Sequence, residues 1–182
     1  IHAQNRAAGL GQAGQRLALN LAGVEKGDVR RGDWLLPAAL HAPTRRIDVR
    51  LSVLPAEATP LAHWTPLHLH LGAEDVGARV VLLETGAIAP GRDALVQLDL
   101  DRPIGALHGD RFILRDQSAL RTLGGGIVTD AFAPDSRRRR AERVAALVAM
   151  DQATPQAALA ALLALQPALG VDLQAFATQW AL

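Results

Sequence analysis

The chain has 182 residues, 49% of them apolar, and its 19 basic and 18 acidic side chains give a formal net charge of +1. That length allows one medium domain or two small ones, with enough apolar side chains to form a core. The near balance of charge does not by itself indicate a nucleic-acid-binding protein. The sequence contains no cysteine, which excludes disulfides, cysteine-ligated zinc and a cysteine nucleophile.

No apolar run approaches the roughly 20 residues that a membrane-spanning helix needs. The N-terminus lacks the basic flank and apolar segment of a signal peptide. We therefore expect a cytoplasmic protein without membrane association. The chain begins with Ile1 rather than Met, and its first residues are typical of a strand interior, so we expect the sequence to be a piece of a longer protein.

Residues 1–37 consist of short apolar runs separated by glycine. Residues 15–21 alternate polar and apolar side chains, which is the period of a half-buried strand. Residues 32–36 predict another strand, and residues 26–31 predict a polar turn. Residues 38–45, which include Pro43, are interpreted as a linker.

Residues 46–132 predict an all-β domain, because alternating segments follow one another at short intervals with turn residues between them. The expected strands are residues 47–54, 67–71, 78–83, 94–100, 111–115 and 125–129. Six strands without an intervening helical pattern favour a closed antiparallel barrel, with every second residue of each strand inside. The glycine run at Gly124, Gly125 and Gly126 enters a strand rather than a helix, so it predicts close backbone packing instead of a phosphate site.

Residues 133–182 change to a helical pattern. Ser136 is suited to cap a first helix. A second helix is predicted to begin at Pro155, which suits the first helical position, and a third near Asp172. The side chains expected to pack together are Leu159, Leu162, Leu163, Leu173, Phe176 and Trp180. The fold class is therefore mainly β, followed by a short and incomplete α-helical segment.

Two clusters of side chains suggest chemistry. His63, His68 and His70 form a histidine cluster, and two imidazoles on one strand face can begin a metal site. This leaves open a metal-dependent β-barrel enzyme, against the simpler reading of a polar barrel face. The basic run Arg137, Arg138, Arg139 and Arg140 is suited to contact RNA phosphates, or it is a solvated helix start joining two domains.

The order of several short motifs resembles a known family. Ala13-Gly14-Gln15-Arg16, followed by Arg31-Gly32-Asp33-Trp34-Leu35-Leu36, is similar to the end of domain II of translational GTPases. Together with Ile1-His2-Ala3-Gln4-Asn5, these motifs are close to the selenocysteine-specific elongation factors in particular. Pro66-Leu67-His68-Leu69-His70 and the stretch from Asp110 through Gly126 resemble domain III of that family. Residues 137–182 look like the start of its winged-helix extension.

The resemblance implies a domain organisation and a function. Residues 1–37 would be the C-terminal half of the domain II β-barrel, residues 46–132 the domain III barrel, and residues 133–182 the start of a winged-helix domain. The family delivers selenocysteyl-tRNA to the ribosome, uses GTP with Mg, and reads a selenoprotein mRNA hairpin through C-terminal domains. The GTPase domain and the hairpin-binding domains would lie outside this chain, which would contribute aminoacyl-tRNA binding and amino-acid selection. Whether the chain is itself an enzyme stays open.

The resemblance also assigns two binding residues. An arginine of domain II lines the aminoacyl pocket in that family, and the motif match places it at Arg16. His2 aligns with the position that meets the terminal adenosine of the tRNA. A selenol is much more acidic than a thiol, so a fixed cation would pair with the selenolate and be left poorly paired by neutral serine. The alternative is an ordinary outward-facing strand arginine, and the alternative family is another translational GTPase.

Overall fold

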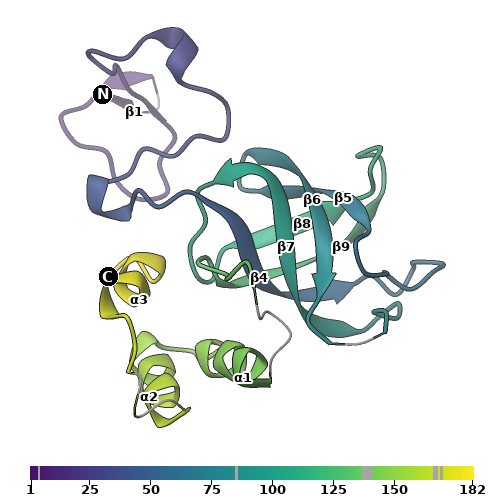
Figure 1. Ribbon diagram of the computed structural model, residues 1–182. Helices are drawn as coiled ribbons and strands as arrows, with labels where there is room; N and C mark the ends of the chain where they lie inside the picture. Colours follow the sequence, from purple (N-terminus) through teal and green to yellow (C-terminus); the bar gives the residue numbers. More distant parts are fainter. Residues whose placement is uncertain (4, 85, 137–140, 166–167, 169) are drawn as a thin grey trace. The chain divides into compact units, whose positions relative to one another are not determined.

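The computed structural model describes residues 1–182 except residues 4, 85, 137–140, 166–167 and 169. The chain divides into two compact units, Ile1–Arg31 and Gly32–Leu182. Each unit has its own secondary structure, which Figure 1 follows along the sequence from the purple N-terminus to the yellow C-terminus. Among the described residues, no helix has the length and apolar character needed to cross a membrane.

The unit Ile1–Arg31 contains a small antiparallel sheet of three two-residue strands. They are β1 (His2–Ala3), β2 (Arg6–Ala7) and β3 (Leu17–Ala18), arranged in the order β2-β1-β3. A single 3-10 turn, η1 (Lys26–Asp28), follows, and the Asp28 carboxylate accepts the backbone N–H of Glu25 at 3.3 Å. The polar turn predicted from residues 26–31 is thus present, whereas the strand predicted over residues 15–21 is confined to two residues.

The centre of the second unit is a closed antiparallel barrel with the strand order β4-β7-β6-β5-β8-β9 (Figure 1). Its strands are β4 (Thr44–Val53), β5 (Pro66–Leu71), β6 (Glu74–Leu82), β7 (Asp93–Ile104), β8 (Arg111–Arg115) and β9 (Thr122–Asp130). The prediction of a closed six-stranded barrel is confirmed. Each of the six strands predicted for the barrel overlaps an observed strand, and the predicted and observed strands differ mainly at their ends.

Alternation along the strands fills the barrel. In β5, Leu67, Leu69 and Leu71 are buried, while His68 and His70 on the opposite face are only half-buried. Residues two apart in a strand point to the same side, so this pattern gives one apolar face per strand. The inward faces of all six strands join into one continuous apolar core.

The glycine run lies in β9, where neighbouring backbones leave no room for side chains. Gly124 and Gly126 pair with Val53 and Leu51 of β4, and a Cβ on Gly126 would overlap the carbonyl oxygen of Arg50. A Cβ on Gly125 would lie 2.7 Å from the carbonyl oxygen of Phe112 in β8. The close backbone packing predicted from the sequence is therefore present.

Residues 32–36 are not a strand, in contrast to the prediction. Gly32 has a φ of +103°, a left-handed conformation that glycine adopts readily, and it turns the chain beside Glu74. The following residues form an irregular segment in which the Trp34 ring packs near Gly105. A Cβ atom added to Gly105 would lie 4.0 Å from Trp34 Cγ. A short 3-10 turn, η2 (Ala38–Leu40), then leads into β4.

Three helices complete the second unit: α1 (Ala141–Met150), α2 (Pro155–Leu165) and α3 (Leu173–Gln179). The second helix begins at Pro155 as predicted, and Asp172 caps the third by accepting the N–H of Ala175 at 3.0 Å. Met150, Ala158 and Phe176 form a small second core with Leu159, Leu162, Val171 and Trp180 packed against it. Leu163 and Leu173 were predicted to join this core, but they are 43% and 61% exposed.

Candidate functional site

Both residues predicted to contact the aminoacyl end of a tRNA belong to Ile1–Arg31: His2 lies in β1, and Arg16 immediately precedes β3. Asn5 has a φ of 66° between β1 and β2, a left-handed conformation that asparagine tolerates, and so reverses the chain. Gly14 has a φ of 82°, and a turn in which Gln15 N–H donates to the Gln12 carbonyl at 3.2 Å brings the chain to Arg16. Both reversals follow from short turn-forming residues that the sequence places between apolar segments.

The strand register places the two predicted residues close in the sheet. His2 pairs with Ala18, and Ala3 pairs with Leu17. Arg16 immediately precedes β3, two residues before Ala18. His2, Arg16 and Ala18 are exposed, whereas Ala3 and Leu17 are half-buried. Exposure alternates in β1 and β3, with His2, Arg16 and Ala18 on the more exposed side, whereas both residues of β2, Arg6 and Ala7, are exposed.

The histidine cluster on the barrel does not form a metal site. His68 Nδ1 lies 2.9 Å from Asp75 Oδ1, and His70 Nε2 lies 3.9 Å from the same oxygen. His63 is engaged elsewhere, because its Nδ1 accepts the backbone N–H of Leu82 at 3.2 Å. In the part of the chain that the structure describes, no group of three or more His, Cys, Asp or Glu side chains could hold a metal ion. The metal-dependent enzyme therefore has no support from the geometry.

The pairing of His68 with Asp75 has an electrostatic consequence. The hydrogen bond from His68 holds the pKa of the Asp75 carboxyl below its ordinary value, with the nearby charges of His70 and His68 acting in the same direction. Arg115 lies opposite His68 on β8, and Arg79 stacks over the Trp64 ring at 5.6 Å. This outer face of β5, β6 and β8 therefore presents imidazole and guanidinium groups on a rigid surface.

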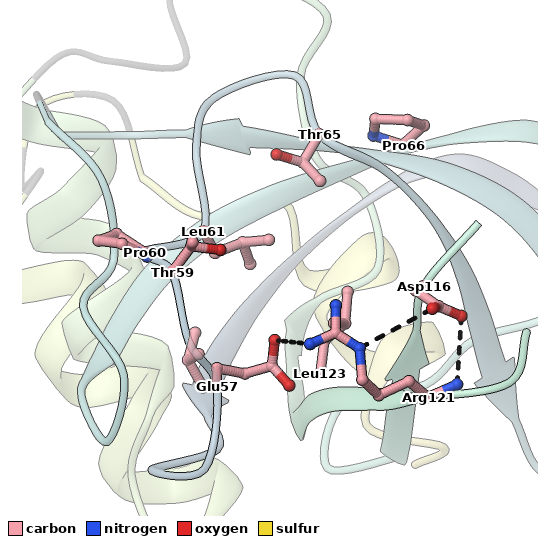
Figure 2. A pocket seen from close by; sticks show the side chains of 10 residues that line it. Glu57, Thr59, Pro60, Leu61, Thr65, Pro66, Asp116, Arg121 and Leu123 are labelled. Carbon is pink, nitrogen blue, oxygen red and sulfur yellow. Dashed lines mark hydrogen bonds and ion pairs between the residues drawn. The ribbon is translucent and has the colours of Figure 1, made fainter. Parts of the chain in front are cut away.

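A cavity of about 190 Å³ opens between the β4–β5 connection and the β8–β9 turn (Figure 2). Arg121 Nη1 donates to Glu57 Oε2 at 2.8 Å, and Asp116 lies on the other side of the same guanidinium (Figure 2). The Asp116 carboxylate also accepts the backbone N–H of Arg121 and the Ser118 hydroxyl, and these bonds lower its pKa. The cavity is smaller than the roughly 300–1,000 Å³ of typical small-molecule sites.

Glu57, Arg121 and Asp116 join the β4–β5 connection to the β8–β9 turn, and no pattern in the sequence predicts this contact. Glu57 and Arg121 are 64 positions apart, and an isolated acidic and an isolated basic residue at such a separation predict no contact. By contrast, the Asp116–Ser118 turn has a recognisable signature, because aspartate and serine favour local turns of this kind. The basic run Arg137, Arg138, Arg139 and Arg140 lies outside the described residues.

Comparison with known proteins places this geometry in a family context. Residues 48–135 match the family model described as the beta-barrel domain of the selenocysteine-specific elongation factor. The matched segment extends from β4 to just beyond β9, so it coincides with the closed barrel.

Curated relatives extend the similarity beyond the barrel. A selenocysteine-specific elongation factor of Escherichia coli (strain K12) is 39% identical over 158 residues, which cover 86% of this chain and 24% of the relative. A protein of the same name from Desulfomicrobium baculatum is 32% identical, over 76% of this chain and 22% of the relative. Elongation factor Tu 2 of Streptomyces avermitilis is 33% identical, over 65% of this chain and 31% of the relative. The chain thus spans between 22% and 31% of the length of these relatives.

Proposed function

Because the chain belongs to the selenocysteine-specific elongation factor family, we propose that it binds the aminoacyl end of selenocysteyl-tRNA and helps to select its amino acid. The observation that carries the proposal is the pairing of β1 with β3, which brings His2 opposite Ala18, two residues after Arg16. In this assignment Arg16 reads the side chain of the amino acid, and His2 meets the terminal adenosine.

The chemistry of the substrate favours an arginine in this position. Selenocysteine and serine are carried by the same tRNA, so discrimination depends on one atom of the side chain. An ionised selenol forms a charge-assisted contact with a guanidinium, and a neutral hydroxyl forms a weaker one. A site that is built around a fixed charge also rejects a ligand that leaves this charge poorly paired.

The strand geometry allows the two assigned residues to act together. His2 lies opposite Ala18, so these two side chains point to the same side of the sheet. Residues two apart in an extended segment also point to the same side, so Arg16 lies on the side of His2. Arg16 is exposed, and Ala18 beside it on that side is small, so the guanidinium is accessible to a ligand. Arg6 pairs with Ala3 instead and therefore belongs to the opposite side of the same sheet.

The proposal includes the role of the longer protein. It delivers selenocysteyl-tRNA to the ribosome at a recoded UGA codon, with GTP and Mg bound outside this chain. Residues 1–37 act as the C-terminal half of the domain II barrel, and residues 133–182 begin a winged-helix region whose continuation reads the mRNA hairpin. Arg137, Arg138, Arg139 and Arg140 are proposed to contact RNA phosphates, which guanidinium groups bind in a fork.

The barrel is proposed to add a second contact to the tRNA. Its outer face carries Arg79, Arg115 and the His68–His70 pair, and such groups bind phosphate oxygens without reading sequence. The similarity to elongation factor Tu 2 leaves a second candidate, a general aminoacyl-tRNA carrier, in which the barrel would act alike. The two candidates differ at Arg16, because only a factor that selects selenocysteine needs a cation there.

The test is a pair of affinities measured for the full-length factor in the presence of GTP. Arg16→Ala should weaken binding of selenocysteyl-tRNA by about tenfold to over a hundredfold, which is the value of a charge-assisted contact of about 1.5–3 kcal/mol. Binding of seryl-tRNA should change little. Arg16→Lys should rescue only part of the loss, because an ammonium keeps the charge but not the planar fork.

Arg6→Ala is the matched control, since it removes the same charge from the same sheet on the opposite side. It should leave both affinities unchanged. Equal losses for the two tRNAs in Arg16→Ala would show that this arginine grips the tRNA in general or holds the fold. In that case the amino-acid-selecting role would be wrong.

A further inference from the structure

The outer surface of the barrel carries an acidic pair that is buried beneath the residues packed on it. Asp48 of β4 lies directly opposite Asp130 at the end of β9. The Asp48 side chain is fully buried, and that of Asp130 is 11% exposed. Two carboxylates side by side out of water are costly unless a cation and hydrogen bonds compensate for them.

Arg143 of α1 supplies that cation. Its Nε donates to Asp48 Oδ2 at 2.8 Å, and its Nη2 donates to Asp130 Oδ2 at 2.7 Å and also to Asp48. The guanidinium thus spans both carboxylates, and the Arg143 side chain is itself only 17% exposed. Burial is the largest influence on Asp48 and raises the pKa of its carboxyl, which the charge of Arg143 only partly offsets.

A buried amide joins the acidic pair to the chain segment that leads into α1. Gln97 of β7 donates from Nε2 to Asp48 Oδ1 and to the carbonyl oxygen of Pro134, both at 3.0 Å. One side chain therefore completes the hydrogen bonding of Asp48 and holds the connection between β9 and α1. The four side chains of this group come from four different elements: Asp48 from β4, Gln97 from β7, Asp130 from β9 and Arg143 from α1. Arg143 can therefore reach the carboxylates only when α1 lies on the barrel.

Other contacts between the helices and the barrel are more exposed or lie at a different helix. Arg50 pairs with Asp151 just beyond α1, but these side chains are 39% and 36% exposed. At the end of α3, the Trp180 ring stacks on His108 at 3.8 Å. Exposed ion pairs contribute little to stability, so the buried group around Arg143 is the contact that distinguishes a docked α1 from a free one.

We propose that Arg143 is a positioning residue that fixes α1, and with it the α2 that packs on α1, on the barrel, and that Asp48, Asp130 and Gln97 form its receptor; the end of α3 has its own contacts to the barrel through Gln179 and Trp180. Moving α1 away would take from both carboxylates the cation that pairs with them, so α1 is either docked or released rather than variably tilted. Any segment that binds to these helices is thereby kept at a fixed position relative to the barrel. The inference does not rest on the proposed function, because it concerns contacts within Gly32–Leu182 alone.

The experiment is a distance measurement between two spin labels on this cysteine-free chain. Ala160→Cys in α2 and Gln117→Cys in the β8–β9 turn place single labels at exposed positions. The parent should give one narrow distance peak. Arg143→Met should replace that peak with a broad set of distances, while circular dichroism shows that the barrel remains folded.

Arg50→Met is the matched control, because it removes an arginine that joins the barrel to the end of α1 through an exposed pair. It should keep the narrow peak. Arg143→Lys keeps the charge without spanning both carboxylates and should give an intermediate width; this variant carries the test if Arg143→Met does not fold. A broad distribution in the parent, or a parent-like peak in the Arg143 variants, would overturn the proposal.

Discussion

The unit Ile1–Arg31 and the barrel both contain alternating polar and apolar sequences, but only the barrel buries the apolar side chains. In the barrel, alternation places one side of each strand in a closed apolar core, where Val49, Leu69 and Leu98 are completely buried. In Ile1–Arg31, none of the described residues is buried, and Leu10 is 73% exposed. Alternation alone therefore does not make a core: the strands must also close on one another.

This comparison has a consequence for where stability and recognition reside. The barrel positions its surface residues rigidly because each of its strands pairs with a neighbour on both sides. The small sheet supports its residues through two-residue strands and the turns at Asn5 and Gly14. We therefore expect substitutions in the barrel to change the free energy of unfolding, and substitutions in the small sheet to change binding.

The largest difference is expected from matched leucine truncations. Leu98→Ala removes a side chain that is 0% exposed in the barrel core, and it should lower the free energy of unfolding by about 2–5 kcal/mol. Leu19→Ala removes one that is 44% exposed, and it should change this free energy by less than about 0.5 kcal/mol. Urea unfolding followed by circular dichroism gives both values. Similar losses at the two positions would contradict the division of roles.

A smaller difference is expected from matched glycine substitutions. Gly126→Ala would force a Cβ onto the carbonyl oxygen of Arg50, and overpacking of this kind costs about 1–3 kcal/mol. Gly9→Ala in the other unit meets no atom within 4 Å. The thermal unfolding midpoint should fall for Gly126→Ala and remain unchanged for Gly9→Ala. An unchanged midpoint for Gly126→Ala would mean that β4 and β9 are less tightly paired than described.

The sequence predicted the barrel well for a physical reason. Its strands are long enough for the period of two to be visible, and turn residues such as Gly91 and Gly109 separate them. The starts of the second and third helices were equally readable, since proline at the first position and an aspartate cap act locally. The strand expected over residues 32–36 was wrong because the left-handed turn at Gly32 and packing of Trp34 are not encoded in alternation.

Long-range contacts were beyond prediction from one sequence. Asp48 and Arg143 are 95 positions apart, and only the folded barrel brings them together. Arg16 and His2 were assigned through a family resemblance, and nothing in the local pattern shows that β1 and β3 pair. The fold adds that register, while the role of each residue stays a prediction for experiment.

If Arg16 reads a negative charge on the amino acid, the selection between the two charged tRNAs should depend on pH. The measurement is the ratio of affinities for selenocysteyl-tRNA and seryl-tRNA, taken above and below the pKa of the selenol, in the parent and in Arg16→Ala. The parent should prefer selenocysteyl-tRNA above that pKa and lose most of the preference below it, because protonation removes the partner of the guanidinium. Arg16→Ala should show a low ratio that does not vary with pH. A parent ratio that stays constant as the selenol is protonated would show that Arg16 does not read the charge of the selenolate.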